Sequence, residues 1–192
     1  MPASIRASID AHIAVIQGLA SMEQDIARFA ERAWHCLAGG GRLFWIGNGG
    51  SAADCQHLAA ELVGRFERER RGIAAIALTT DSSVMTSVSN DYGFESVFAR
   101  QVEALCRPGD MLVGLSTSGN SANVLKALEV AARLGVERVG LTGGSGGRLR
   151  EQCELCLVVP SDNTARIQEA HILIGHILCD LIEGQAVDAA LC

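Results

Sequence analysis

A histidine and a glutamate follow a glycine-rich turn in GNGGSAADCQHLAAE, the segment of residues 47–61. His57 and Glu61 are four positions apart, so on a helix they lie on one face. An imidazole and a carboxylate placed in this way can act as a general acid and a general base, and both can bind a metal ion. By itself such a pair is commonly a surface contact, so it indicates acid–base chemistry only together with other residues.

A second group of polar side chains lies in RIQEAHILIGH, residues 166–176, which has the pattern of a helix. The group consists of Gln168, Glu169, His171 and His176. A histidine within an apolar helix is commonly a hydrogen-bonded core residue. Beside His57 and Glu61, however, this group would supply a base, an acid and candidate metal ligands.

Two further segments have the composition of anion-binding loops. They are GNGGSA at residues 47–52 and STSGNS at residues 116–121, and each stands between an apolar run and a helical segment. Glycines let backbone N–H groups approach an oxyanion, and a helix N-terminus adds about half a positive charge. One such loop could simply cap a helix, but two of them favour an anion site. The hydroxyl groups available as donors are those of Ser116, Thr117, Ser118 and Ser121.

Neither loop has the pattern of a nucleotide site. A dinucleotide fingerprint requires an acidic residue about 20 positions after the glycines, and Asp81 lies too far along the chain. No lysine follows the glycines, which excludes a nucleoside-triphosphate loop. The loops therefore favour a small phosphorylated metabolite. In SNDYGFE, residues 89–95, Asn90 and Asp91 could contact the hydroxyl groups of such a ligand or could only cap and turn the chain.

Short apolar runs that alternate with helical segments must position these side chains. Such an alternation predicts a doubly wound α/β domain with a parallel sheet, in which ligands bind at the carboxyl ends of the strands. Residues 3–38 have helical periodicity and would precede the sheet as an N-terminal arm. The predicted strands are 43–46, 74–78, 111–115, 138–141 and 155–159, and the predicted helices lie near 51–65, 83–90, 95–105, 121–134, 147–152 and 165–184.

Length and composition exclude several classes of protein. A chain of 192 residues is expected to form one domain, and its net charge of −6 argues against nucleic acid as a partner. No apolar run approaches the roughly 20 residues of a membrane span, and the N-terminus does not resemble a signal peptide. Seven cysteines indicate reduced thiols in a cytoplasmic protein, and the lone C-x-x-C formed by Cys153 and Cys156 is interpreted as incidental.

Six motifs, in their order along the chain, resemble the phosphoheptose isomerases (sedoheptulose-7-phosphate isomerases) of the sugar isomerase (SIS) domain superfamily. The resemblance covers nearly the whole chain and implies a flavodoxin-like sheet of five parallel strands. It further implies a homotetramer with active sites between subunits, and a chain divided into a helical arm, 1–38, and one SIS domain, 39–192. The motifs are GNGGSAADCQHLAAELVGRF, ALTTD, SNDYGF, GLSTSGNSANV, LTGGSGG and RIQEAHILIGHIL.

The same resemblance implies an activity and assigns residues to it. The expected reaction converts sedoheptulose 7-phosphate to D-glycero-D-manno-heptose 7-phosphate, a precursor of ADP-heptose for lipopolysaccharide or related heptosides. Glu61 would be the base and His176 the acid. A zinc ion, one per subunit, would be bound by His57, Glu61, Gln168 and His176. The substrate contacts implied in this way are Asn48, Gly49, Gly50, Ser51, Glu61, Asn90, Asp91, Ser116, Thr117, Ser118, Ser121 and Gln168.

One departure and two other functions have to be weighed against this assignment. Ala165 stands where some members have aspartate, which affects local substrate contacts but not the acid–base pair. A non-catalytic adaptor, resembling the bacterial replication-initiator-associating protein, would need neither Glu61 nor His176. A sugar-phosphate sensor with this fold usually carries a DNA-binding domain, for which the chain has no room.

The spacing of Gln168 and His176 poses a geometric problem. Eight residues apart on one helix, their backbones are separated by roughly 12 Å along the axis, although their directions differ by only about 80°. Both side chains can face one cleft, but meeting at a single metal ion would stretch their reach. We therefore expect a neighbouring subunit to bring His57 and Glu61 against this helix.

Overall fold

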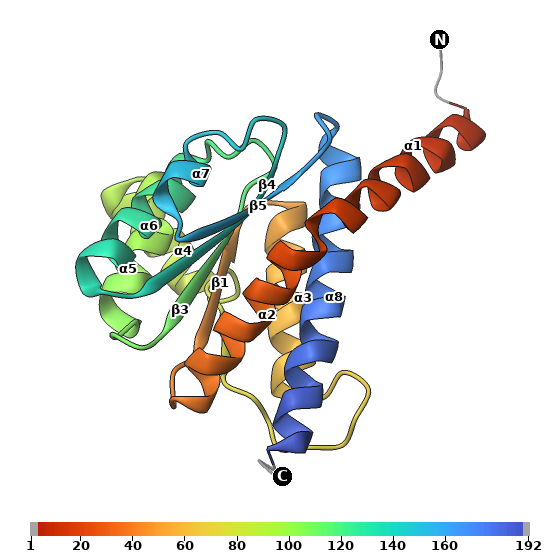
Figure 1. Ribbon diagram of the computed structural model, residues 1–192. Coiled ribbons are helices and arrows are strands. Elements are labelled where there is room, and N and C mark those ends of the chain that lie inside the picture. Colours follow the sequence, from red (N-terminus) through yellow and green to blue (C-terminus); the bar gives the residue numbers. More distant parts are fainter. Residues whose placement is uncertain (1–3, 190–192) are drawn as a thin grey trace.

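Five parallel strands form the centre of the molecule in a computed structural model that describes residues 4–189. The strand order is β2-β1-β3-β4-β5, and helices cover both faces of the sheet (Figure 1). The doubly wound α/β architecture predicted from the sequence is thus confirmed. The strands are β1 (Leu43–Gly47), β2 (Ala75–Ala77), β3 (Met111–Leu115), β4 (Glu137–Gly143) and β5 (Leu155–Val159).

The strands form because their residues can be buried on both faces. All five residues of β1 are buried, and so are all five of β3. Successive side chains alternate between the faces: Trp45 belongs to one core cluster, whereas Phe44 and Ile46 belong to the other. Strands of this kind read as continuous apolar runs, which is why they are recognisable in the sequence.

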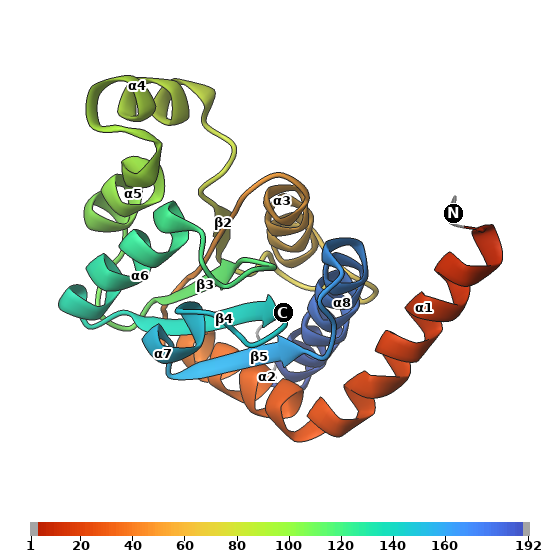
Figure 2. The same ribbon diagram turned by 90° about the horizontal axis from the view of Figure 1, so that it is seen from above.

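Two groups of helices cover the sheet. One face carries α2 (Glu23–Ala38), α3 (Gly50–Val63) and α8 (Thr164–Asp188), which lie side by side (Figure 2). The other face carries α5 (Val97–Leu105), α6 (Ala122–Leu134) and the short α7 (Leu149–Gln152). Helix α4 (Ser82–Tyr92) packs on α5, and the 3-10 turn Phe94–Ser96 links the two. The carboxylate of Asp81 caps α4 by accepting a hydrogen bond from the N–H of Val84 (3.0 Å).

The N-terminal arm consists of two helices. Helix α1 (Ile5–Gly18) is separated from α2 by a 3-10 turn, Leu19–Met22. No residue of α1 is buried, whereas α2 buries Phe29 and Ala33 completely. Helix α1 projects from the rest of the chain (Figures 1 and 2) and exposes Ile5, Ile9 and Ile13.

Helix α8 is longer and more apolar than the sequence analysis anticipated. It has 25 residues, and an 18-residue window reaches a mean hydropathy of 1.2, so that by length and composition it could cross a membrane. Half of that window is buried inside the fold, where the helix packs on α2 and α3. It also contains two wholly buried polar residues, His171 and Glu183. In this structure α8 is therefore a core helix.

The six cysteines within residues 4–189 are free thiols. Burial raises the pKa of Cys156 to about 11 and also raises that of Cys153, where the charge of Cys156 adds to the effect. Both thiols thus stay protonated near neutral pH and lack the thiolate that exchange chemistry requires.

Candidate active site

The two candidate anion-binding loops, residues 47–52 and 116–121, follow neighbouring strands at which the chain changes the direction in which it crosses the sheet. The first follows β1 and the second follows β3, and these two strands are neighbours. From β1 the chain proceeds to β2 on one side, and from β3 it proceeds to β4 and β5 on the other. In open α/β sheets a crevice forms at such a switch point, beyond the carboxyl ends of the strands.

Backbone geometry in the first loop favours glycine at position 49. Gly49 has φ +56° and ψ −121°, in a region that residues with a side chain rarely adopt. A Cβ atom on Gly50 would lie 2.6 Å from Nε2 of Gln168, which shows that the amide of Gln168 rests directly on the loop. Ser51, in the first turn of α3, is buried. The loop therefore exposes backbone at the N-terminus of α3, as an anion site requires.

A reciprocal pair of amides joins the first loop to the second. Asn48 Nδ2 donates to Asn123 Oδ1 (2.9 Å), and Asn123 Nδ2 donates back to Asn48 Oδ1 (2.8 Å). Asn123 is buried in the first turn of α6 and was not selected from the sequence, where only its place directly behind STSGNS could have indicated it. The pair holds the two loops at a set separation.

The hydroxyl groups of the second loop do more than cap a helix. Ser121 occupies the N-cap position of α6, but its side chain makes no capping hydrogen bond. Instead, its Oγ lies 2.9 Å from Oγ of the buried Ser116. Thr117 and Ser118 line a cavity of about 230 Å³ that extends towards the ends of β4 and β5. The capping alternative therefore does not account for Ser121.

The candidate acid–base residues meet between α3 and α8. Nε2 of His57 lies 2.9 Å from Nε2 of His176 and 3.3 Å from Oε1 of Glu61. Which imidazole would donate at the first contact depends on the tautomers of the two rings. The ring of Phe66 stacks on His176, with 5.6 Å between centroids and 29° between planes. His176 is thus held between His57 and Phe66.

All of these contacts occur within one chain. Helices α3 and α8 run side by side in the same direction, so that Gly50 meets Gln168 near their beginnings and His57 meets His176 farther along. The expectation that a neighbouring subunit must bring His57 and Glu61 to His176 is wrong. It considered α8 alone, whereas α3 of the same chain supplies both partners.

Gln168 does not join this cluster. Its amide packs against Gly50 at the start of α3, while His176 lies eight residues along α8 beside His57. In residues 4–189, no group of three or more His, Cys, Asp or Glu side chains is arranged so that it could hold a metal ion. His57, Glu61 and His176 nevertheless form a donor set of two imidazoles and a carboxylate that suits zinc. Their separations of 2.9 and 3.3 Å are close to the roughly 3.3 Å between two ligands of a tetrahedral zinc ion.

Three other polar residues that drew attention in the sequence lie elsewhere. Asn90 and Asp91 are exposed near the end of α4, and Asn90 Nδ2 donates to Asp91 Oδ1 (2.8 Å). His171 is buried, with Nε2 3.2 Å from the carbonyl oxygen of Thr142, and burial lowers its pKa to about 4. His171 is therefore a neutral core histidine.

Glu169 also lies outside the cluster, where it ties α8 to α1. One of its carboxylate oxygens lies 2.7 Å from Nδ1 of His12, and the other accepts from Arg166 (2.5 Å). Its role within one chain is thus structural.

Asp54 is a neighbour of the site that the sequence analysis missed. It lies on α3 three residues before His57, and its Oδ2 is buried without a hydrogen-bond partner among the described residues. Burial raises its pKa to about 6, against the opposing effect of the His57 charge. The spacing of Asp54, His57 and Glu61 on one helix was the available signal.

Comparisons with known proteins agree on one family. Residues 9–143 match the SIS domain family. The chain is 56% identical to the phosphoheptose isomerase of Roseiflexus sp. (strain RS-1), with 93% of this chain and 89% of that protein aligned. It is 54% identical to the phosphoheptose isomerase of Akkermansia muciniphila, with 87% and 88% aligned.

Solved structures lead to the same family. The phosphoheptose isomerase from Neisseria gonorrhoeae superposes with a TM-score of 0.89 at 43% identity, covering 94% of this chain and 97% of that one. The phosphoheptose isomerase from Francisella tularensis gives a TM-score of 0.91 at 42% identity, covering 94% and 96%.

Proposed function

This chain belongs to the phosphoheptose isomerase family of SIS domain proteins, and from that premise we propose how its site works. The enzyme isomerises sedoheptulose 7-phosphate to D-glycero-D-manno-heptose 7-phosphate. The observation that carries the proposal is that His57, Glu61 and His176 meet between α3 and α8. His57 and Glu61 lie on α3, the helix that begins at the first anion-binding loop.

The reaction moves a proton between C1 and C2 of the sugar. Glu61 takes a proton from C1 while His176 donates one to the carbonyl oxygen on C2, which gives an enediol. Glu61 then returns a proton to C2, and His176 removes the proton from the oxygen on C1, which leaves the aldehyde. No atom is gained or lost, and each residue ends in its starting protonation state. The contact of His176 with His57 (2.9 Å) provides a second imidazole with which the proton can be exchanged.

The loops at 47–51 and 116–121 hold the phosphate and the sugar hydroxyls. The donors proposed for this are the backbone N–H groups and helix N-termini that follow β1 and β3, together with the hydroxyls of Ser116, Thr117, Ser118 and Ser121. Binding the unreactive end of the substrate there aligns C1 and C2 with Glu61 and His176. The position of Gln168 against Gly50 suits a contact with the substrate at the same loop.

Zinc is part of this proposal. His57, Glu61 and His176 would hold the ion, and Gln168 could join them only by leaving Gly50. A bound zinc ion supplies a Lewis acid that polarises the substrate carbonyl. Because a carboxylate bound to zinc is a weaker base and an imidazole nitrogen bound to zinc carries no proton to donate, Glu61 and His176 would each have to serve their two roles at different times.

Zinc binding can be measured without turnover. Metal analysis of the purified protein is expected to find about one zinc ion per chain, and His57→Ala should abolish binding while the chain remains folded. The matched control is His35→Ala, which removes an exposed histidine of α2. Unchanged zinc content in His57→Ala would contradict the assignment.

Assembly and location are also proposed, namely a homotetramer in the cytoplasm. Helix α1 exposes a row of isoleucines, and beside it an apolar groove of about 460 Å³ runs between α2 and α8. These are surfaces that association would bury. Asn90 and Asp91 are exposed near the end of α4, and we assign them to the site of a neighbouring subunit. The groove is lined by Ile16, Leu19, Ala20, Glu23, Ile26, Ala27, Leu173, Ile177 and Leu181.

Incubation of the purified protein with sedoheptulose 7-phosphate tests the central proposal. NMR should show the aldehyde-derived anomeric signals of the seven-carbon aldose phosphate as those of the ketose decline. In deuterated water, deuterium should enter at C2, since the enediol exchanges its proton with a base in contact with solvent. A protein that is folded, loaded with zinc and unable to change the ketose would refute the function and favour the adaptor alternative.

A further inference from the structure

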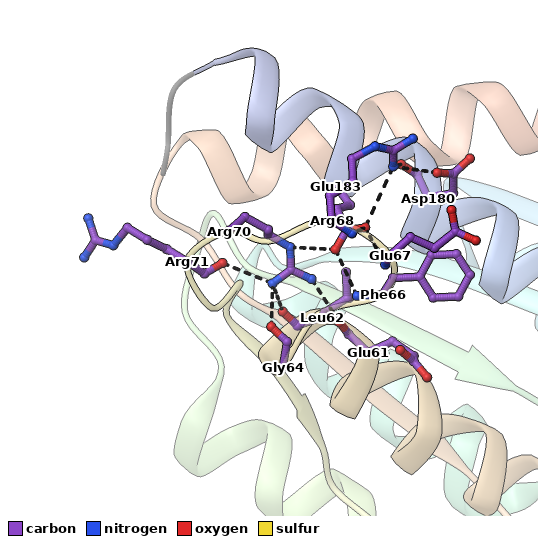
Figure 3. A network of polar contacts seen from close by, with 10 residues as sticks. All are labelled: Glu61, Leu62, Gly64, Phe66, Glu67, Arg68, Arg70, Arg71, Asp180 and Glu183. Atoms are coloured by element: carbon purple, nitrogen blue, oxygen red, sulfur yellow. Dashed lines mark hydrogen bonds and ion pairs between the residues drawn. The ribbon is translucent and has the colours of Figure 1, made fainter.

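A buried carboxylate on α8 organises the segment that follows α3. Glu183 is wholly buried, and its two oxygens accept hydrogen bonds from three successive backbone N–H groups (Figure 3). The N–H of Phe66 donates to Oε1 (2.9 Å), and those of Glu67 and Arg68 donate to Oε2 (2.7 Å each). Three consecutive N–H groups on one anion fold the segment tightly around it.

A buried guanidinium completes the arrangement. The Arg70 side chain is fully buried, and its Nε lies 3.1 Å from Oε1 of Glu183. Its terminal nitrogens donate to the carbonyl oxygens of Glu61 (2.9 Å), Leu62 (2.8 Å) and Gly64 (3.0 Å) (Figure 3). These carbonyls end α3, so Arg70 satisfies acceptors that a helix C-terminus leaves free and lies at the negative end of the helix dipole.

Both halves of this network reach the acid–base residues. Arg70 holds the backbone of Glu61 itself. Glu183 holds the backbone of Phe66, whose ring stacks on the imidazole of His176. His176 and Glu183 are seven residues apart on α8, which is about two helical turns and places them on one face. The ring of Phe66 is thus the link between the charged pair and His176.

We propose that Glu183 and Arg70 are positioning residues of the isomerase. Through Phe66 they hold the imidazole of His176, and through the end of α3 they hold Glu61, each in its reactive place. This inference rests on the proposed roles of Glu61 and His176. A buried ion pair is a weak source of stability, since well-packed apolar residues often serve as well. Its hydrogen bonds to the segment that carries Phe66 give this pair a purpose that apolar packing would not.

Glu183→Gln is the first test. The amide keeps the size of the side chain, but its NH2 group faces N–H donors and leaves Arg70 without a counter-charge. We expect kcat to fall roughly 10- to 100-fold, the effect of a displacement of about 1 Å at the reacting groups. KM for sedoheptulose 7-phosphate should change less than about twofold, because the anion-binding loops lie at the other end of α3.

Asp180→Asn is the matched control. Asp180 lies one turn before Glu183 on α8 and forms an exposed ion pair with Arg68 (2.6 Å). Its loss should leave kcat unchanged. Both variants are to be compared at a temperature well below their thermal unfolding, so that a loss of folded protein is not read as a loss of kcat.

A second variant tests the route from Glu183 through Phe66 to His176, and it does not depend on whether Glu183→Gln folds. Phe66→Leu keeps an apolar side chain at a half-buried position but removes the ring. It should also lower kcat, and Glu183→Gln should cost less in the Phe66→Leu background than in the wild type, because the route through Phe66 is then already lost. In the absence of substrate, the ring-current shift of the His176 C–H protons should be lost in Phe66→Leu, strongly reduced in Glu183→Gln and kept in Asp180→Asn. The His176→Ala spectrum assigns these signals.

The outcomes separate the two proposals. Wild-type kcat in Phe66→Leu, additive losses in the double variant or an unmoved His176 signal in Glu183→Gln would each overturn the positioning role. A wild-type protein without isomerase activity would instead overturn the proposed function, while the NMR comparison would still report whether Glu183 places Phe66 against His176.

Discussion

His57 is the central residue of the acid–base cluster, because it contacts both Glu61 and His176. The two proposed catalytic residues differ in surroundings: Glu61 shares α3 with His57, whereas His176 comes from α8 and lies against Phe66. Because both residues are proposed to transfer protons while the loops bind the phosphate, a single change at either residue should affect proton transfer more than binding.

Glu61→Gln is expected to lower kcat by several orders of magnitude and to change sugar-phosphate affinity little, because the amide keeps the size of the side chain but cannot take a proton from carbon. Steady-state kinetics together with calorimetric binding of sedoheptulose 7-phosphate would measure both quantities. Glu67→Gln, an exposed glutamate just beyond α3, is the control. Near-normal turnover in Glu61→Gln would remove Glu61 as the base.

Asp54 makes the stability of the protein depend on pH. Its pKa of about 6 in the folded state exceeds its ordinary value of 3.8, so the fold favours the protonated form. This contribution is fully present below about pH 4 and is lost as the pH rises through about 6. Asp54→Asn should therefore be more stable than the wild type at pH 8, by up to about 1 kcal/mol after allowance for solvent around a half-buried group, and equally stable near pH 3.5.

Thermal unfolding of the two proteins across this range measures the difference. For a chain of this size, 1 kcal/mol corresponds to a change of about 2–4 °C in Tm. A Tm difference that is the same at pH 3.5 and pH 8 would show that the carboxyl group does not titrate in the folded protein as described.

At the scale of elements, the site depends on two strand ends and one pair of helices. The loops after β1 and β3 are held together by Asn48 and Asn123, and α3 and α8 run in the same direction with successive contacts between them. Phosphate binding and proton transfer are thus assigned to different parts of α3, its N-terminus and its second half. Changes in the loops should accordingly affect binding of the phosphate end.

Ser118→Ala should weaken binding of sedoheptulose 7-phosphate by about tenfold and leave the weak binding of unphosphorylated sedoheptulose unchanged, since one hydroxyl donor to the phosphate is lost. Ser161→Ala is the matched control. Both serines accept a hydrogen bond from the N–H two residues ahead at 3.2 Å, but Ser161 follows β5. Equal losses for the two sugars in Ser118→Ala would place the phosphate elsewhere.

At the scale of the whole molecule, one chain brings its acid–base residues together, whereas Asn90 and Asp91 are exposed near the end of α4 and are assigned to a neighbouring subunit. Mixed oligomers can distinguish these two arrangements. Glu61→Gln refolded together with His176→Ala should remain inactive, because every chain would lack one member of a pair that one chain supplies. Glu61→Gln refolded with Asp91→Ala should regain part of the activity, because some sites would combine an intact acid–base pair with an intact Asp91 from a neighbour.

Activity is to be measured after joint refolding, and each variant refolded alone serves as the control. Recovery in the first mixture would contradict the placement of Glu61 and His176 in one site of one chain. A second mixture as inactive as its parents, from variants that are each inactive alone, would contradict the assignment of Asp91 to a neighbouring site.

The sequence by itself determined the architecture and most of the candidate residues. Strands buried on both faces leave continuous apolar runs, and helices leave a 3.6-residue period, so both are local signals that need no knowledge of neighbours. The two loops were found because they directly follow two of those apolar runs. The four-residue spacing of His57 and Glu61 placed both on one face of α3. The resemblance to a family selected His176 from a helix in which His171 is an equally plausible histidine by pattern alone.

Only the tertiary structure decided which residues meet across elements. That His57 contacts His176 in the same chain, that Gln168 rests on Gly50, and that Glu183 binds the segment carrying Phe66 all follow from the packing of α3 on α8. These helices are separated by more than 100 residues, and no local pattern encodes their relative position. The spacing on α3 could have placed Asp54 beside His57, but the burial that raises its pKa comes from the folded surroundings and not from its neighbours in the sequence.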